Sequence, residues 1–160
     1  MKTKLSILTL TMIALGFMAT TVRAQSPHYI TGPDASLDDN NYCVAFKEAG
    51  LGSGGVQVTY TVTADATFTF QCFTKKGNMP QGEPNSVSFS GLTGQTTLTA
   101  HNGQITGEVC LVPQGAGRCR GKGLVNRLVG ACYQNVTFSD TATGDTFDMP
   151  TLFSGVGCPP

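Results

Sequence analysis

The sequence contains no tryptophan, only two histidines, and few charged residues, which make up 12% of the chain. No stretch of ten or more residues places apolar side chains at helical spacing, so a mainly helical domain is excluded. A G-x-S-x-G nucleophile elbow is also missing, and Ser53 in GLGSGG is interpreted as part of a flexible turn. His28 falls in a predicted leader and His101 in a predicted turn, so neither is placed as the base that a nucleophile requires. We therefore predict that the protein is not an enzyme and has neither catalytic residues nor a cofactor.

The first 24 residues have the pattern of a secretory signal peptide. A short positive segment is followed by an apolar run from Leu5 to Ala19, and then by small residues at Val22 and Ala24. A membrane-spanning helix needs roughly 20 apolar residues, which is more than this run supplies. We expect cleavage after Ala24 and a secreted, extracellular protein with no membrane association after cleavage.

Removal of this segment changes the charge balance. All ten acidic residues follow Ala24, whereas three of the ten basic residues precede it, so the exported chain has a net charge of 7 − 10 = −3. A mildly acidic surface argues against nucleic acid as a partner, because such proteins carry a basic footprint. We interpret the local basic group Arg118, Arg120, Lys122 and Arg127 as a solvated loop beside a strand.

Six cysteines follow the predicted signal peptide, and they are Cys43, Cys72, Cys110, Cys119, Cys132 and Cys158. An even number of cysteines in an exported chain predicts disulfides, here three of them. The alternative is a zinc site, but the sequence has no C-x-x-C and neither histidine lies beside a cysteine.

Period-two alternation dominates the rest of the sequence. From Val56 to Phe73, apolar residues alternate with polar ones, mostly threonine, which predicts a half-buried strand. At about 3.3 Å per residue this strand would be too long for one small sandwich, so we expect it to bend near Ala64-Asp65-Ala66. The other predicted strands are 42–46, 86–89, 95–100, 103–112, 124–133, 135–139 and 146–153, with a hairpin turn at Asn102-Gly103.

Seven to nine short strands predict an all-β fold, an antiparallel β-sandwich that is immunoglobulin-like in general architecture. The missing tryptophan and the cysteine spacing argue against a true immunoglobulin domain. We divide the chain into a signal peptide (1–24), an extended leader (25–37) and one sandwich domain (38–160).

Six cysteines allow fifteen pairings, and geometry gives a slight preference among them. If strands 103–112 and 124–133 form a hairpin, Cys110 lies opposite Cys132. Cys119 could then reach Cys72, and Cys43 would pair with Cys158. A local bond between Cys110 and Cys119 is the competing possibility.

Five segments, FKEAGLG (46–52), VTYTVTADATFTFQC (58–72), KKGNMPQG (75–82), NGQITG (102–107) and NVTFSDTATG (135–144), resemble a family of small exported bacterial β-sandwich proteins of unknown function. The resemblance covers roughly residues 34–144. It implies export and an all-β fold and attaches no activity to any residue. This chain has more cysteines than the family pattern leads us to expect, which leaves the pairing open.

Two oxygen-rich segments, 34–41 and 140–148, could supply calcium ligands. Neither fits an EF-hand loop, and we interpret both as turns whose side chains bond their own backbone. We therefore expect no metal. Asn135-Val136-Thr137 is a glycosylation sequon, which we interpret as ordinary strand sequence in a bacterial protein.

One feature could serve binding, a flat face made by the threonine-rich strands with Tyr42, Tyr60, Tyr133 and Phe73. Our hypothesis is a secreted, non-catalytic binding or interaction module, with an extracellular polysaccharide or a protein as partner. The alternatives are a small secreted hydrolase or inhibitor, and an interbacterial toxin or competition factor.

Overall fold

A computed structural model describes residues 26–76, 79–155 and 158, and its elements are all β-strands. The eight strands are β1 (His28–Asp38), β2 (Asn41–Ala49), β3 (Gln57–Thr74), β4 (Pro80–Thr99), β5 (Gln104–Leu111), β6 (Leu124–Asp140), β7 (Thr146–Met149) and β8 (Leu152–Gly155). The predicted all-β class is confirmed. The predicted signal peptide (1–24) lies outside the described residues.

Within the described ranges, no helix is long and apolar enough to cross a bilayer.

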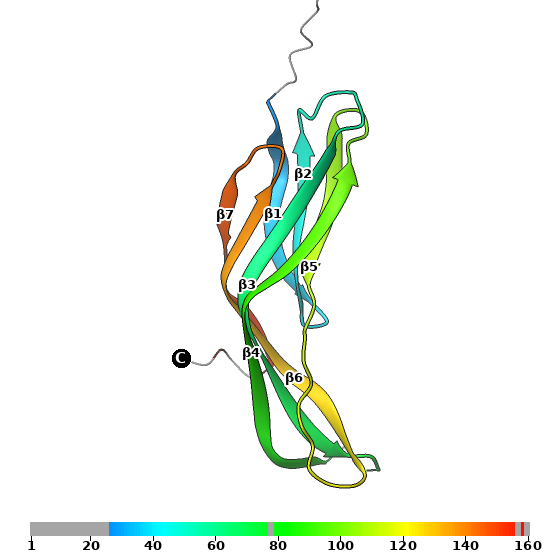
Figure 1. The fold of residues 1–160 in the computed structure, drawn as a ribbon, viewed down its shortest axis with the longest axis vertical. Helices are drawn as coiled ribbons and strands as arrows, with labels where there is room; N and C mark the ends of the chain where they lie inside the picture. The colour runs from blue at the N-terminus through cyan, green and yellow to red at the C-terminus, as the bar shows by residue number, and fades with distance from the viewer. Residues whose placement is uncertain (1–25, 77–78, 156–157, 159–160) are drawn as a thin grey trace, which may run out of the picture.

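The strands form two antiparallel sheets that face each other (Figure 1). The smaller sheet has the order β1-β2-β5, and the larger has the order β4-β3-β6-β7, with β8 also paired to β6. The alternation in β3 explains the layering. Val58, Tyr60 and Val62 are at most 1% exposed and point to the core, whereas the threonines between them lie half-exposed on the outer face. The predicted antiparallel sandwich is confirmed.

The long strand β3 bends where the sequence predicts. Its register shifts between Ala64 and Ala66 against β4, and between Thr63 and Asp65 against β6. Asp65 holds this bulge, because its carboxylate accepts hydrogen bonds from the backbone N–H of Gly91 at 3.1 Å and from Asn135 Nδ2 at 2.8 Å. The sequon asparagine is therefore part of the bend.

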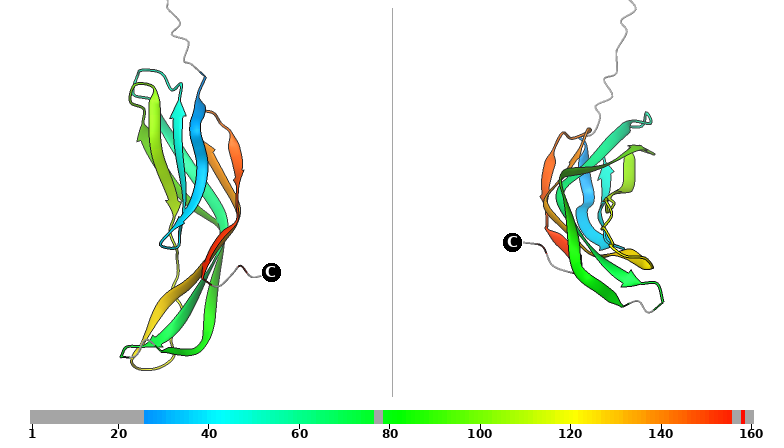
Figure 2. Two further views of the ribbon diagram at one scale, coloured as in Figure 1. Left: turned by 180° about the vertical axis from the view of Figure 1, so that it is seen from behind. Right: turned by 60° about the horizontal axis from the view of Figure 1, so that its bottom comes forward.

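Below the bend, β3, β4 and β6 continue past the smaller sheet as a three-stranded extension (Figure 2). Residues 112–123, which we call the strap, cross the inner face of this extension in place of a second sheet. Gly115 lies against Phe89, Gly117 lies against Phe70, and the Arg118 N–H donates to Asn85 Oδ1 at 3.2 Å. The strap thus buries apolar residues that no strand covers.

Gly117 is where the strap comes closest to the extension. A Cβ there would lie 2.4 Å from Phe70 Cβ, so Gly117→Ala must lift the strap. We expect a loss of about 1–3 kcal/mol in the free energy of unfolding, measured by urea denaturation. Gly54→Ala is the matched control, because nothing lies within 4 Å of its Cβ position. A neutral effect of Gly117→Ala would show that the strap does not pack as described.

The structure corrects several predicted boundaries. From residue 28 on, the predicted leader (25–37) is part of the sandwich, because 28–38 form β1 and pair with β2. The segments 86–89 and 95–100 belong to one strand, β4, as do 124–133 and 135–139 in β6. The segment 146–153 is two strands, β7 and β8. The Asn102-Gly103 turn closes on the bridge between His101 and Gln104, but it joins strands of different sheets.

The three disulfides are Cys43–Cys110, Cys72–Cys119 and Cys132–Cys158. The predicted Cys72–Cys119 bond is confirmed. The predicted pairs Cys110–Cys132 and Cys43–Cys158 are wrong, as is the competing pair Cys110–Cys119.

The error has one physical cause. The prediction assumed that β5 and β6 form a hairpin, but the strap separates them and places them in different sheets. β5 pairs with β2, where Cys110 lies directly opposite Cys43 with a Cα–Cα distance of 4.1 Å. Cys132 instead bonds Cys158 near the C-terminus.

Candidate functional site

The outer face of β3 and β4 carries a ladder of hydroxyl groups, which we call the hydroxyl face. Successive threonines of β3 face hydroxyl or amide side chains of β4, because the antiparallel register places them opposite one another. The side-chain pairs, with hydrogen bonds of 2.9 to 3.4 Å, are Thr59–Thr97, Thr61–Gln95, Thr63–Thr93, Thr67–Ser88 and Thr69–Ser86. The bend at Asp65 divides the ladder into an upper and a lower part.

The hydroxyl face is regular and retains bonding capacity. Neighbouring strands lie about 4.8 Å apart, and alternate residues along a strand lie about 6.6 Å apart. A hydroxyl group has one donor and two acceptor positions, so a paired hydroxyl can still bond a ligand. The members of the face are exposed or half-exposed. This array can hydrogen-bond an extended polar chain laid along β3.

The structure does not place the predicted tyrosines on this face. Tyr42, Tyr60 and Tyr133 are each 0% exposed and point into the core. Tyr42 donates to the Pro150 carbonyl at 2.8 Å and Tyr133 to the Asn40 carbonyl at 2.7 Å, and burial raises the pKa of both phenols to about 12. That part of the hypothesis is wrong.

Phe73 is half-exposed, in contrast to the tyrosines. The guanidinium Cζ of Arg127 lies 5.2 Å from the centre of its ring. The two residues come from neighbouring strands, β3 and β6, near the end of the extension. They form a mixed cationic and aromatic contact there.

Sequence reasoning missed a buried network of tyrosine and carboxylate groups. Tyr29 donates to Asp140 Oδ2 at 2.6 Å, and Tyr60 donates to Glu48 Oε2 at 2.5 Å. Glu48 is 0% exposed, and its other oxygen has no hydrogen-bond partner among the described residues. The four residues connect β1, β2, β3 and β6. The period-two pattern carries a signal for this, since Glu48 falls in the same alternation as the buried Val44 and Phe46.

The pKa values of the two carboxyl groups in this network are shifted in opposite directions. Burial raises the pKa of Glu48, and the nearby charge of Asp140 adds to the shift, while the Tyr60 hydrogen bond opposes it. Burial also acts to raise the pKa of Asp140, but hydrogen bonds from Tyr29, Thr143 and the Ala142 N–H outweigh it and leave the pKa below its ordinary value. Because the network lies within the core, its role is to hold strands together.

The remaining polar candidates, His28, Ser53 and His101, have different surroundings. His28 Nδ1 is 2.9 Å from the Ser26 carbonyl at the start of β1. Ser53 lines a shallow hollow formed by the β2–β3 and β4–β5 connections, with Asn102 and several glycines. His101 lines a different hollow, beside Lys47. That Ser53 is a turn residue and that the protein is not an enzyme both stay predictions.

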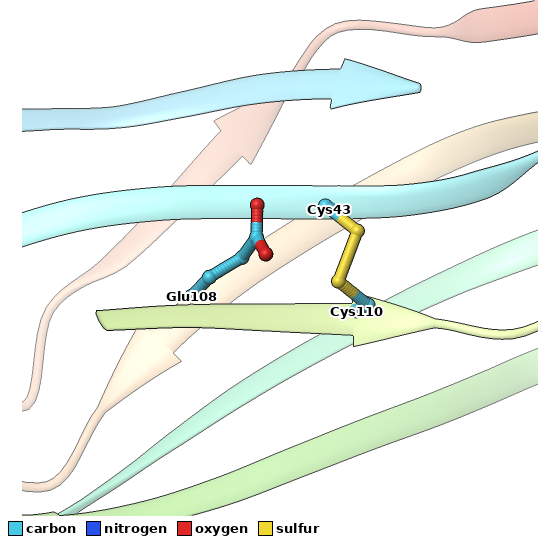
Figure 3. Close-up of side chains that lie close together, drawn as sticks. All are labelled: Cys43, Glu108 and Cys110. Carbon is cyan, nitrogen blue, oxygen red and sulfur yellow. A yellow bond between two sulfur atoms is a disulfide. The ribbon is translucent and has the colours of Figure 1, made fainter. Parts of the chain in front are cut away.

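Three potential metal ligands come together at Cys43, Glu108 and Cys110 (Figure 3). Both sulfur atoms are bonded to each other, so neither is a thiolate that could bind a metal ion. Glu108 is exposed on β5 beside the disulfide.

The two oxygen-rich segments form turns. Asp39 and Asn40 both have positive φ, as a two-residue turn between β1 and β2 requires. Asp140 accepts bonds from the backbone N–H groups of Ala142 and Thr143 within its own turn. That the protein binds no metal stays a prediction.

Comparisons with family models, with curated proteins and with solved structures find no match. The resemblance to small exported bacterial proteins therefore stays a prediction.

Proposed function

We propose that the protein is a secreted, non-catalytic module that binds a polysaccharide on its hydroxyl face. The observation that carries this proposal is the ladder of five cross-strand pairs along β3 and β4. Polysaccharides present repeating hydroxyl groups, which donate and accept hydrogen bonds as the threonines do. An immunoglobulin-like general architecture is part of the proposal, and it suits a module that presents one sheet face.

Two physical properties support this choice of ligand. Threonine has a restricted χ1 angle, and cross-strand bonds restrict these side chains further, so little conformational entropy is lost on binding. Three disulfides match the oxidising conditions outside the cell, where such polysaccharides are found.

Removing two hydroxyls from the lower part of the face tests the proposal. Thr67→Val combined with Thr69→Val keeps the side-chain shape and strand propensity but deletes two hydroxyl groups. We expect affinity for a retained polysaccharide to fall about thirtyfold, since two hydrogen bonds are lost and each contributes roughly 1 kcal/mol. The measurement is depletion from solution by cellulose, chitin or bacterial cell walls, as a function of polymer concentration.

A matched variant tests whether the loss of affinity is specific to the hydroxyl face. Thr31→Val combined with Thr106→Val removes two exposed hydroxyls from the smaller sheet and should bind as the unmodified protein does. The proposal fails if no polymer retains the unmodified protein, or if both double variants lose affinity equally.

A further inference from the structure

Basic residues gather at the free end of the three-stranded extension. Of the seven lysines and arginines after residue 25, six lie there, and these are Lys75, Lys76, Arg118, Arg120, Lys122 and Arg127. We call this group the basic end, and all six residues are exposed. Figure 1 shows the end of β3 and the residues near 120, yellow in the ribbon, together at this end of the molecule.

The fold brings the basic end together from two distant segments. The Lys75 N–H donates to the Gly123 carbonyl at 3.1 Å, and Thr74 lies opposite Leu124. The Cys72–Cys119 disulfide joins the same two segments. The sequence shows only the group at 118–127 as a cluster, so the addition of Lys75 and Lys76 is a result of the topology.

The charge is strongly separated along the molecule. At the basic end the only acidic residue is Glu83, which lines a shallow groove of about 420 Å³ with Arg118 and Arg120. The other described residues carry one basic side chain, Lys47, and nine acidic ones. Six like charges at one end repel one another and raise the local concentration of anions.

The basic end is continuous with the hydroxyl face. The lower pairs Thr67–Ser88 and Thr69–Ser86 lie on the extension. Arg127 of β6 lies opposite Gln71, which is two residues beyond Thr69 along β3. A chain bound along the lower part of the face would therefore reach Arg127 and, past the end of β3, Lys75 and Lys76. Arg118 and Arg120 lie on the strap, which crosses the inner face. Such a chain would need hydroxyl groups for the face and negative groups for the end.

We infer that the basic end binds the acidic groups of an anionic polysaccharide whose hydroxyls lie on the hydroxyl face. The inference rests on the proposed function and adds the charge of the ligand to it. A membrane surface fits less well, because Met79 is the one large apolar side chain that is strongly exposed among the described residues of this end. Single-stranded nucleic acid fits less well, because base stacking uses open aromatic rings and Arg127 lies over one face of the half-exposed Phe73 ring.

Two soluble polymers with one backbone test the inference. Carboxymethylcellulose carries carboxylates, and hydroxyethylcellulose is its neutral counterpart. We expect the protein to bind the charged polymer at least about tenfold more tightly at low salt and to lose this advantage at about 1 M salt, where screening is nearly complete. Lys75→Gln, Lys76→Gln and Lys122→Gln combined should weaken binding to the charged polymer about tenfold and leave binding to the neutral one unchanged.

A charge-matched control tests whether binding depends on charge at the basic end or only on the net charge of the protein. Ser26→Glu, Gln104→Glu and Thr146→Glu combined change the net charge by the same three units at exposed positions away from both the basic end and the hydroxyl face. This variant should keep the preference for the charged polymer. Equal weakening by both triple variants, or no salt dependence, would overturn the inference.

The outcomes distinguish the two proposals. Retention by neutral polymers without a preference for charge leaves the proposed function standing and rejects the basic end as the subsite for acidic groups. Tighter binding to anionic phospholipid vesicles or to single-stranded DNA than to carboxymethylcellulose also rejects the inference. Absence of binding to any polymer rejects both.

Discussion

Replacing Cys43 and Cys110 together by alanine is expected to lower the free energy of unfolding by about 4 kcal/mol. This disulfide closes the longest of the three loops, with a sequence separation of 67, and so restricts the unfolded chain most. It also joins β2 and β5 at directly opposite positions in the smaller sheet. Urea denaturation of the unreduced proteins measures the effect.

Removing Cys132 and Cys158 gives the comparison for loop length. Their separation is 26, so the expected loss is about 3.5 kcal/mol on the same chain-entropy argument. A loss below about 1 kcal/mol for the Cys43–Cys110 pair would contradict the prediction. Trypsin digestion without reduction tests the pairing independently. No lysine or arginine follows Arg127, so the observed Cys132–Cys158 bond leaves peptide 128–160 unlinked to any other peptide.

The course of β3 could be predicted from the sequence because it depends on local pattern. Apolar and polar residues alternate from Val58 to Cys72 with only small side chains at Ala64 and Ala66, so both the inner face and the bend are visible. The Cys72–Cys119 bond was predictable for a related reason. It needs only a loop cysteine that reaches the end of a long strand.

The assignment of strands to sheets was not visible in the same way. β5 and β6 are neighbours in sequence, but the strap carries the chain from one sheet to the other between them. Nothing in residues 112–123 marks this crossing, because a glycine-rich hairpin loop and a glycine-rich strap have the same composition. The basic end depends on the same long-range pairing, since Gly123 accepts from the Lys75 N–H across it.

Tyr60→Phe is expected to destabilise the protein by about 3 kcal/mol at pH 8 and by only about 1 kcal/mol at pH 4. The Tyr60 hydroxyl donates the only hydrogen bond that the carboxyl group of Glu48 receives within the described residues. At pH 8 the variant would leave the Glu48 carboxyl group in the core with no donor, so the group must either carry an unpaired charge or take up a proton from a solvent that holds few, and both are costly. At pH 4 the group is protonated, and the variant loses a bond to a neutral acceptor.

The sign follows from the direction of the Glu48 pKa shift. Burial raises the pKa of Glu48 in the folded state, so its contribution to stability is present at pH values below the unfolded pKa of about 4.3 and is lost as pH rises through the folded pKa. The hydrogen bond from Tyr60 opposes this rise in the Glu48 pKa. Tyr60→Phe should therefore enlarge the loss of stability that occurs as pH rises. Asp140 behaves in the opposite sense, because its pKa is lowered and its contribution is lost as pH falls.

Tyr42→Phe is the matched control for this prediction. It removes the same hydroxyl from an equally buried ring, but the lost bond is to the neutral Pro150 carbonyl. Its cost should be about 1 kcal/mol at both pH values. In the background of Glu48→Gln, which cannot ionise, the pH dependence of Tyr60→Phe should disappear. A pH trend that persists in that background, or that Tyr42→Phe shares, would show that Glu48 does not carry the buried charge.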